Sequence, residues 1–449
     1  MEPTIGSKAL TREQREKYLE SLNEETLSAL MRSTWTWDDR ALRRTLSELV
    51  TDLTAVRELR VGEVGCPAPV LEAAESRVLA ATGEFVAEVL GPRLLVDADN
   101  AFRESLLPLV EATGALTAEA SRALDTLAVE VTGQVIERNE SLSAILPEDR
   151  WEEKAFSGSA TGLARVGYSA GYTLADRDYF AAAGLGAQAY TIAGSPIDDS
   201  VDVHRSTLAA AEKTGSWDPA LVRTRAEAAD GGWQLTGEKW YVPSADTAGT
   251  LFVIARTVGG PSLYRVEHDA PGVTIESLDS LDPTRPLARV GFEETPATLI
   301  GREGAGGLIM NRTVDRATTV LAAEQMGIVD RALKCLSDVP PAAADSESWR
   351  GYTRKLAELE LLRACSTALW YRAVKLQGGD DPNAASIAAG MAHIGCSNAV
   401  RQVVLRLTSV TPDLDTTVVR TIAARARYTD LLLGGPALAH ERLLERLGV

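Results

Sequence analysis

The chain has 449 residues, a formal net charge of −17 and a hydrophobic content of 45%. This length is too great for one compact core and predicts two or three domains, while the composition excludes a largely disordered protein. The excess of acidic side chains argues against nucleic acid as the main partner, because binding phosphates requires a basic face.

No apolar run approaches the roughly 20 residues that a membrane span needs, and the first residues lack the features of a signal peptide. The four cysteines have no C-x-x-C spacing, and the four histidines form no pair with the spacing of metal ligands. The sequence contains neither a P-loop motif nor a strand-linked G-x-G-x-x-G motif. We therefore expect a cytoplasmic protein that contacts no membrane and holds no metal.

The first 155 residues or so predict helices. Thr11 and Gln14 have the spacing of a capping box, and apolar residues recur at helical spacing from Glu16 to Met31. Further helices are expected at about residues 38–60, 69–90, 100–111 and 118–138.

The stretch Phe156–Pro196 is dense in Gly, Ala and Tyr. Two interpretations remain open for it: small-residue helices packed against a sheet, or a loop-rich lining for a ligand.

From about residue 206 to 300 the pattern changes to short β-rich runs separated by Gly and Pro. Asp230-Gly231-Gly232 is a strong hairpin signal, and the spacing predicts an antiparallel barrel or sandwich of about 90 residues. Helices return at about residues 314–336, 349–376, 383–409 and 415–433, with a last short one from Pro436. This order predicts a mainly helical α+β protein with a helical bundle beside the sheet.

Several motifs, taken in this order, resemble the acyl-CoA dehydrogenase superfamily of flavoenzymes. The segment from Ala211 to Ala226, which contains Gly215-Ser216-Trp217-Asp218, is similar to the family's T-E-P-x-x-G-S-D segment and the T-x-A after it. Residues 231–242 resemble the family's G-x-x-L-x-G-x-K-x-W-I, and similar pieces follow at 252–257, 271–273, 284–292 and 322–333. The resemblance covers roughly residues 207–449, and the N-terminal half is matched poorly.

This resemblance implies an N-terminal helical domain (residues 1–205), a middle antiparallel β domain (206–303) and a C-terminal four-helix bundle (304–449). It also implies FAD between the β domain and the bundle, and an acyl-CoA or acyl-carrier-protein thioester as substrate. The subunits would form a homo-oligomer or a hetero-oligomer with a paralogue. In the family, a carboxylate removes the α-proton of the thioester while the flavin accepts the β-hydride.

The resemblance also assigns roles to single residues. It places Ala210, Ala211 and Ser216 where the family's loop lies along the flavin. It places Tyr241, Val242 and Pro243 where the family's W-I-T packs against the isoalloxazine ring. The alternative roles are plain strand core for Tyr241 and a simple turn for Ser216.

Four family motifs are replaced. Ala211 and Pro243 lack the hydroxyl groups of the family's threonines, and Pro243 also lacks a backbone donor. Residues 337–348, which are acidic and contain proline, replace the R-x-x-F-G segment that binds the diphosphate, and residues 407–412 replace the loop near the adenosine. Gly434 stands where many members have the catalytic glutamate.

Some members carry the base on the first helix of the bundle, and Asp315 lies near that position. It is about two residues out of register, roughly 200° around a helix, so the alternative role is an acidic residue near a helix N-terminus. We favour an acyl-CoA dehydrogenase-like flavoprotein oxidoreductase that desaturates an acyl thioester, with Asp315 as the candidate base. Two alternatives are a non-catalytic partner subunit or pseudoenzyme of a heteromeric acyl-CoA dehydrogenase, and a flavin-dependent monooxygenase of the same fold.

Overall fold

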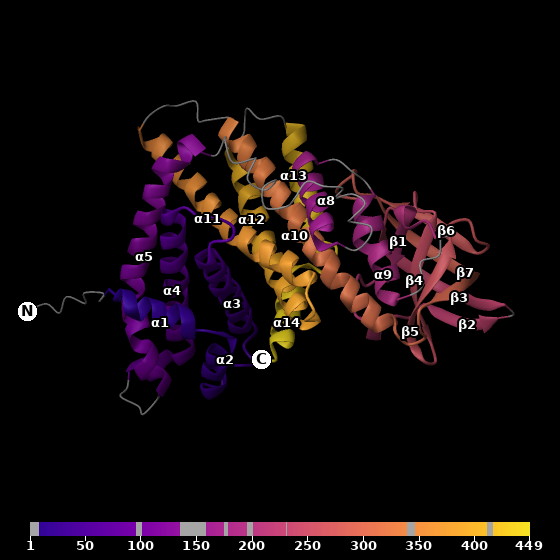
Figure 1. Cartoon of the computed structure of the whole chain (residues 1–449), viewed down its shortest axis with the longest axis horizontal. Helices are drawn as coiled ribbons and strands as arrows, with labels where there is room; N and C mark the ends of the chain where they lie inside the picture. Colours follow the sequence, from indigo (N-terminus) through magenta and orange to yellow (C-terminus); the bar gives the residue numbers. More distant parts are fainter. Residues whose placement is uncertain are drawn as a thin grey trace, which may run out of the picture.

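The computed structural model describes residues 9–95, 101–134, 159–174, 178–194, 201–229, 231–338, 346–410 and 416–449. Helices occupy both ends of the chain and a seven-stranded sheet lies between them, so the prediction of a mainly helical α+β protein is confirmed. Figure 1 shows an elongated molecule with the N-terminal helices at one end, the sheet at the other, and α10 (Gly306–Asp338) running between them. Within the described residues, no helix is long and apolar enough to cross a membrane.

The N-terminal helices are α1 (Arg12–Ser21), α2 (Glu24–Ser33), α3 (Arg40–Val61), α4 (Ala68–Leu90), the short 3₁₀ helix η1 (Gly91–Leu95) and α5 (Ala101–Gln134). The capping box at Thr11 is confirmed, since Gln14 N donates to its Oγ1 at 3.2 Å.

In two places the N-terminal helices of the structure differ from those expected from the sequence. The helical spacing from Glu16 to Met31 belongs to two helices, because Asn23 interrupts the segment and caps α2 by accepting from Thr26 N at 2.9 Å. The two helices expected at 100–111 and 118–138 are one helix, α5, which continues through Pro108.

The described part of the segment rich in small residues is helical, as the first of its two interpretations predicted. It forms α8 (Ala160–Thr173), a π-helix η3 (Phe180–Gly186) and α9 (Ala187–Ala193). Here η3 and α9 pack against strand β1 (Ser206–Ala209), whereas α8 packs against a helix, α10. Glycines bring the backbones of α8 and α10 into contact: a Cβ on Gly171 would lie 2.0 Å from the carbonyl oxygen of Glu324. A Cβ on Gly327 would lie 2.1 Å from the carbonyl oxygen of Tyr168. This helix pair therefore forms a tight seam.

The strands are β1 (Ser206–Ala209), β2 (Arg225–Ala229), β3 (Gly232–Pro243), β4 (Thr250–Thr257), β5 (Gly260–Glu267), β6 (Val273–Leu278) and β7 (Leu287–Ile300). Strands β4, β2, β3, β7 and β5 pair in this order and β5 pairs again with β4, so these strands close into a barrel. Most neighbours are antiparallel, but β1 and β2 run parallel to β4. The expected hairpin joins β2 to β3, with Ala229 opposite Gly232, although Asp230 lies outside the described residues.

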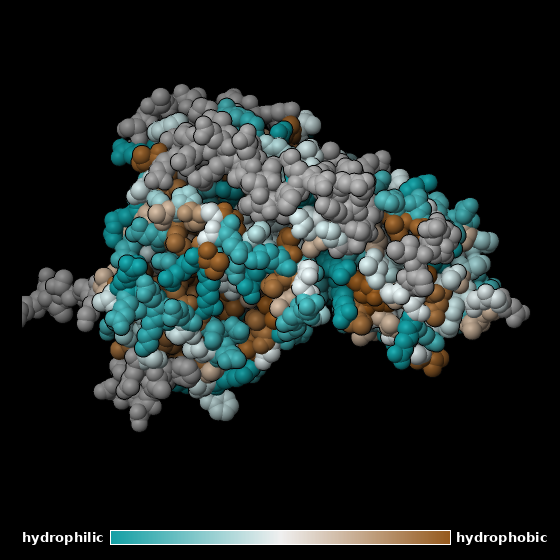
Figure 2. All heavy atoms as spheres, viewed as in Figure 1, coloured by the Kyte–Doolittle hydropathy of each residue, from teal (hydrophilic) through white to brown (hydrophobic). Residues whose placement is uncertain are grey.

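The C-terminal helices are α10, α11 (Ser346–Gln377), α12 (Pro382–Val410), α13 (Thr416–Leu431) and α14 (Gly435–Leu447). They share one hydrophobic core with the N-terminal helices, in which Leu46 and Trp370 both belong to the same buried cluster. Polar contacts also join α3 to α14: Ser47 Oγ lies 2.6 Å from His440 Nδ1. In Figure 2 the helical end of the visible face is mainly hydrophilic, with hydrophobic side chains in separate patches.

Candidate functional site

A pocket of about 380 Å³ lies where the barrel meets the end of α13. Four segments of the chain form its lining: the loop after β1, the end of β3, the loop before β7 with the first residue of β7, and the last turn of α13 with the residue after it. The lining residues are Ala211, Thr214, Gly215 and Trp217; Tyr241, Ser280, Leu281 and Leu287; and Arg427, Tyr428, Leu431 and Leu432.

Glu212 holds the loop after β1 in place. Its Oε1 accepts from the backbone N–H groups of Arg223 and Thr224, both at 2.8 Å, and from Lys239 Nζ at 3.0 Å. Lys239 is fully buried, and burial lowers the pKa of its ammonium group to about 8 although the Glu212 charge opposes this. Burial acts to raise the pKa of Glu212, but the charge of Lys239 and the N–H donors outweigh it and lower that pKa. The hydrogen bonds of Glu212 therefore fix the position of the loop that lines the pocket.

Tyr241 turns out of the barrel wall into the pocket. It lies at a β-bulge between Lys239 and Val242 and has a φ of 56°, which is uncommon for a residue other than glycine. Its side chain is 39% exposed, and its hydroxyl donates to the carbonyl oxygen of Lys213 at 3.3 Å. Tyr241 thus presents an aromatic ring beside the loop that Glu212 anchors.

Four buried charged side chains lie behind the pocket and join the loop before β7 to α10 and α13. Arg425 Nε donates to Asp282 Oδ2 at 2.5 Å, and Arg425 Nη1 donates to Glu324 Oε1 at 2.8 Å. Arg285 Nη2 donates to the same Glu324 oxygen at 2.7 Å. The two positive and two negative charges balance each other, so the cluster fixes the pocket walls without leaving a net buried charge.

A second link joins the anchored loop to α13 directly. Trp217 is buried, and its Nε1 donates to the carbonyl oxygen of Leu432 at 3.2 Å. The barrel side and the helical side of the pocket are therefore held at a defined spacing.

Only part of the expected flavin-contacting set lines the pocket: Ala211 and Tyr241 do. Ala210 is buried and its carbonyl oxygen accepts from Lys239 Nζ at 3.0 Å, while Val242 belongs to the core inside the barrel. Ser216 and Pro243 belong to the chain segments that form the pocket, but each makes a hydrogen bond within the protein instead of lining the pocket. Ser216 Oγ accepts from Asp218 N at 3.1 Å, and the carbonyl oxygen of Pro243 accepts from Thr207 Oγ1 at 2.7 Å.

Asp315, the candidate base, lies on α10 and is not among the residues that line this pocket. Its carboxylate accepts from Ser386 Oγ at 2.5 Å and forms an ion pair with Arg446. At Gly434, the φ of 110° and the 2.6 Å distance from an added Cβ to Leu438 Cδ2 disfavour a glutamate. Neither position places a free carboxylate in the pocket.

The last turn of α13, which supplies Arg427, Tyr428 and Leu431, was not among the site residues predicted from the sequence. One signal could have indicated it. Gly434 stands three residues after Leu431, at the position that the resemblance assigned to the family's base, and a turn directly before such a position would border the site.

Comparison with known proteins agrees with this architecture. The family model of the acyl-CoA dehydrogenase middle domain matches residues 207–294. The mitochondrial 2-methylacyl-CoA dehydrogenase of Solanum tuberosum is 28% identical over 170 residues, which cover 36% of this chain and 40% of that protein. The ChsE4-ChsE5 complex from Mycobacterium tuberculosis has a TM-score of 0.55 at 18% identity, covering 74% of this chain and 97% of that chain. The FAD complex of PigA has a TM-score of 0.58 at 17% identity, covering 73% and 97%.

The glutaryl-coenzyme A dehydrogenase complex with glutaryl-CoA has a TM-score of 0.56 at 16% identity, so the fold is that of the acyl-CoA dehydrogenases. Residues 207–294 therefore match the acyl-CoA dehydrogenase middle domain, and the related sequences and solved structures place the chain, at low identity, with the acyl-CoA dehydrogenase superfamily. The chain spans about 40% of the length of the plant relative that it matches.

Proposed function

We propose that the chain binds the flavin ring of FAD and an acyl thioester in the pocket between the barrel and α13, as one subunit of an acyl-CoA dehydrogenase-type oxidoreductase. The position of the pocket carries this proposal. The loop from Ala211 to Trp217, which resembles the family's flavin-contacting segment, faces the last turn of α13 there. The names of the relatives support it, since the plant relative is an acyl-CoA dehydrogenase and PigA is described with FAD.

The lining suits a planar ring with a polar edge. The volume lies within the range of about 300–1,000 Å³ that is usual for ligand pockets, and Tyr241 offers an aromatic face for stacking. Burial raises the pKa of Tyr428, which keeps its hydroxyl protonated as a donor. Arg427 is the single basic residue in the described lining, and it would stabilise a phosphate or negative charge on the ring. When bound, the flavin would supply the hydride acceptor.

The described residues of the same lining include no carboxylate and no imidazole. Because Asp315 is paired with Arg446, it is poorly placed to accept a proton from a thioester in this pocket. We therefore propose that the base comes from a second chain, and that this chain alone is a non-catalytic partner. The ChsE4-ChsE5 neighbour, which its title describes as a complex, offers a precedent for two-chain assembly within the fold.

The absorption and fluorescence of FAD, recorded while it is added to the purified chain, test the flavin site. We expect a shifted flavin band and quenched fluorescence, because Tyr241 would stack on the ring, and we expect the quenching to be lost in Tyr241→Ala. Val258→Ala is the matched control, since Val258 is a fully exposed apolar residue of the barrel outside the pocket lining. An unchanged FAD spectrum with the native chain would refute flavin binding here.

Anaerobic addition of an acyl-CoA to the flavin-loaded chain tests the second part. With this chain alone the absorbance of oxidised flavin should persist, because the described lining residues include no base. Bleaching by the acyl-CoA would show that the chain carries its own base. If the bleaching were then lost in Asp315→Asn, Asp315 would be the base, and the conclusion that it lies outside the site would also be wrong.

A further inference from the structure

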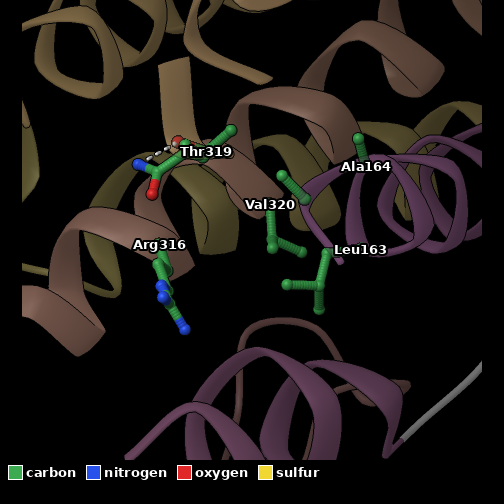
Figure 3. Close-up of a pocket in the computed structure, with 7 residues that line it drawn as sticks. Leu163, Ala164, Arg316, Thr319 and Val320 are labelled. Carbon is green, nitrogen blue, oxygen red and sulfur yellow. Dashed lines mark hydrogen bonds between the residues drawn. The ribbon is translucent and has the colours of Figure 1, made fainter. Parts of the chain in front are cut away.

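Two hollows in the described part of the chain differ greatly in size. In the hollow between α8 and α10, Leu163 and Ala164 lie across a gap from Val320 (Figure 3), and its volume is only about 10 Å³, room for one water molecule at most. The pocket beside α13 has about 380 Å³. Of these two, only the pocket beside α13 can take an organic ligand, and its polar lining determines which atoms that ligand must offer.

Four hydroxyl groups belong to the described lining of this pocket, those of Thr214, Tyr241, Ser280 and Tyr428. Two of them are bonded within the loop after β1. Thr214 Oγ1 accepts from a backbone N–H of that loop at 3.4 Å, and the Tyr241 hydroxyl donates to a carbonyl oxygen of the same loop at 3.3 Å. Ser280 is half-buried, so water can reach its hydroxyl.

Tyr428 differs from the other three because its hydroxyl is buried and has no partner within the protein. The residue is 7% exposed, and in the part of the chain that the structure describes no group forms a hydrogen bond with its hydroxyl. A buried hydroxyl without a partner costs free energy, and native proteins rarely leave one unsatisfied. Because Tyr428 lines the pocket, a ligand can supply the missing acceptor.

The turn of α13 that carries Tyr428 is fixed on both sides. Three residues earlier, Arg425 forms two buried ion pairs, and four residues later the carbonyl oxygen of Leu432 accepts from Trp217 Nε1 at 3.2 Å. Burial raises the pKa of Tyr428 while the nearby charges act in opposite directions, so the hydroxyl stays protonated. A donor that is held in place before the ligand arrives loses little entropy on binding.

The barrel side of the pocket offers no equivalent donor. Ala211 and Pro243 stand where the resemblance places threonines of the family, and neither has a hydroxyl group. The hydroxyl groups of Thr214 and Tyr241 are bonded within their own loop. The helical side, through Tyr428, therefore supplies the buried donor that the barrel side lacks.

We propose that the Tyr428 hydroxyl donates a hydrogen bond to a carbonyl oxygen of the flavin ring and thereby sets the orientation of the ring in the pocket. This inference rests on the proposed flavin site. The carbonyl groups of a flavin lie on its pyrimidine ring, and its methyl groups lie at the opposite end. One fixed donor can therefore select which end of the ring faces α13, as a few placed polar groups do in most ligand pockets.

Tyr428→Phe removes the hydroxyl and keeps the aromatic ring, and FAD binding to the full-length chain is followed by flavin fluorescence. We expect the affinity to fall about 5–50-fold, because a carbonyl oxygen of the bound ring then stays buried without a donor. Riboflavin has the same ring without phosphate or adenosine, and it should lose affinity by the same factor. A loss for FAD alone would place the hydroxyl at the phosphates and overturn the proposal.

Tyr264→Phe is the matched control, because Tyr264 is a fully buried tyrosine inside the barrel and outside the pocket lining. It should leave FAD binding unchanged, and equal losses in the two variants would overturn the proposal. Infrared spectra of bound FAD give a direct readout. A hydrogen bond weakens a C=O bond, so one flavin carbonyl band should move to higher wavenumber in Tyr428→Phe, and identical carbonyl bands would contradict the proposed bond.

Chemical denaturation without flavin separates ligand recognition from a structural role. Because the Tyr428 hydroxyl has no partner within the described protein, Tyr428→Phe should be at least as stable as the native chain. A clear loss of stability would show a structural role and overturn the proposal. A native chain that binds no FAD would overturn the flavin site and this inference together, whereas FAD binding that is unchanged in Tyr428→Phe would overturn only the role of Tyr428.

Discussion

Replacing Gly171 with alanine should force α8 away from α10. The added Cβ would lie 2.0 Å from the carbonyl oxygen of Glu324 and 2.8 Å from its carbonyl carbon. Both atoms belong to the backbone of α10, so no change of rotamer can relieve the contact. Reaching an ordinary contact distance requires the two helices to separate by about 1.4 Å at this point.

The expected cost follows from two opposing effects. Overpacking of this kind destabilises a protein by about 1–3 kcal/mol, while alanine is the better helix former by up to about 1 kcal/mol. We therefore expect the free energy of unfolding to fall by about 1–2 kcal/mol in Gly171→Ala. Movement of Glu324 would also disturb its bonds to Arg285 and Arg425, which adds to the loss.

Chemical denaturation followed by circular dichroism measures this change. Gly351→Ala is the matched control, because Gly351 is exposed on α11 and an added Cβ meets nothing within 4 Å. That control should gain roughly 0.5–1 kcal/mol from helix propensity alone. If Gly171→Ala were as stable as Gly351→Ala, the close approach of α8 to α10 would be refuted.

Two further predictions concern buried charge and use the same denaturation assay. Arg425→Met should lower the free energy of unfolding by about 3–5 kcal/mol, because it leaves Asp282 buried without its partner. Arg44→Met, which breaks the exposed ion pair with Glu48, should lower it by less than about 0.5 kcal/mol. Similar losses in the two variants would contradict the burial of the cluster. Burial lowers the pKa of His393 to about 4, so the folded state holds it neutral while the unfolded chain, with an ordinary pKa near 6.5, binds a proton as the pH falls. Stability should therefore drop by about 2 kcal/mol between pH 6.5 and 5, and an equal drop in His393→Leu would show that another group is responsible.

The sequence predicted the order of helices, barrel and helices because each element carries its own local pattern. Thr11 with Gln14 marks a helix start, and the Asp-Gly-Gly turn marks the β2–β3 hairpin. The break at Asn23 was missed because apolar residues on both sides keep helical spacing. In the structure the backbone is extended at Leu22 and Asn23, and Asn23 caps α2 by accepting from Thr26 N. The shared core of α3 and α11 could not be predicted, since it joins segments about 300 residues apart that carry no mutual signal.

The candidate site was likewise predicted only in part from the sequence. The motif around Glu212 and Lys239 indicated the loop after β1, because the two residues that pair are both part of the recognised pattern. The motif did not show which neighbours face the pocket: Val242 and Tyr241 are adjacent, but a bulge sends one into the barrel and the other into the pocket. The pairing of Asp315 with Arg446 was also hidden, because it depends on how α10 and α14 pack.

The contact between α3 and α14 affects how the chain folds during its synthesis. Ser47 and His440 are separated by 393 residues, so α3 is synthesised long before α14. The apolar face of α3 therefore stays without this neighbour while the residues between the two helices are made, and exposed hydrophobic surface favours aggregation during that time. Contacts of such separation also slow folding, so the newborn chain is expected to depend on chaperones at least until α14 has been made.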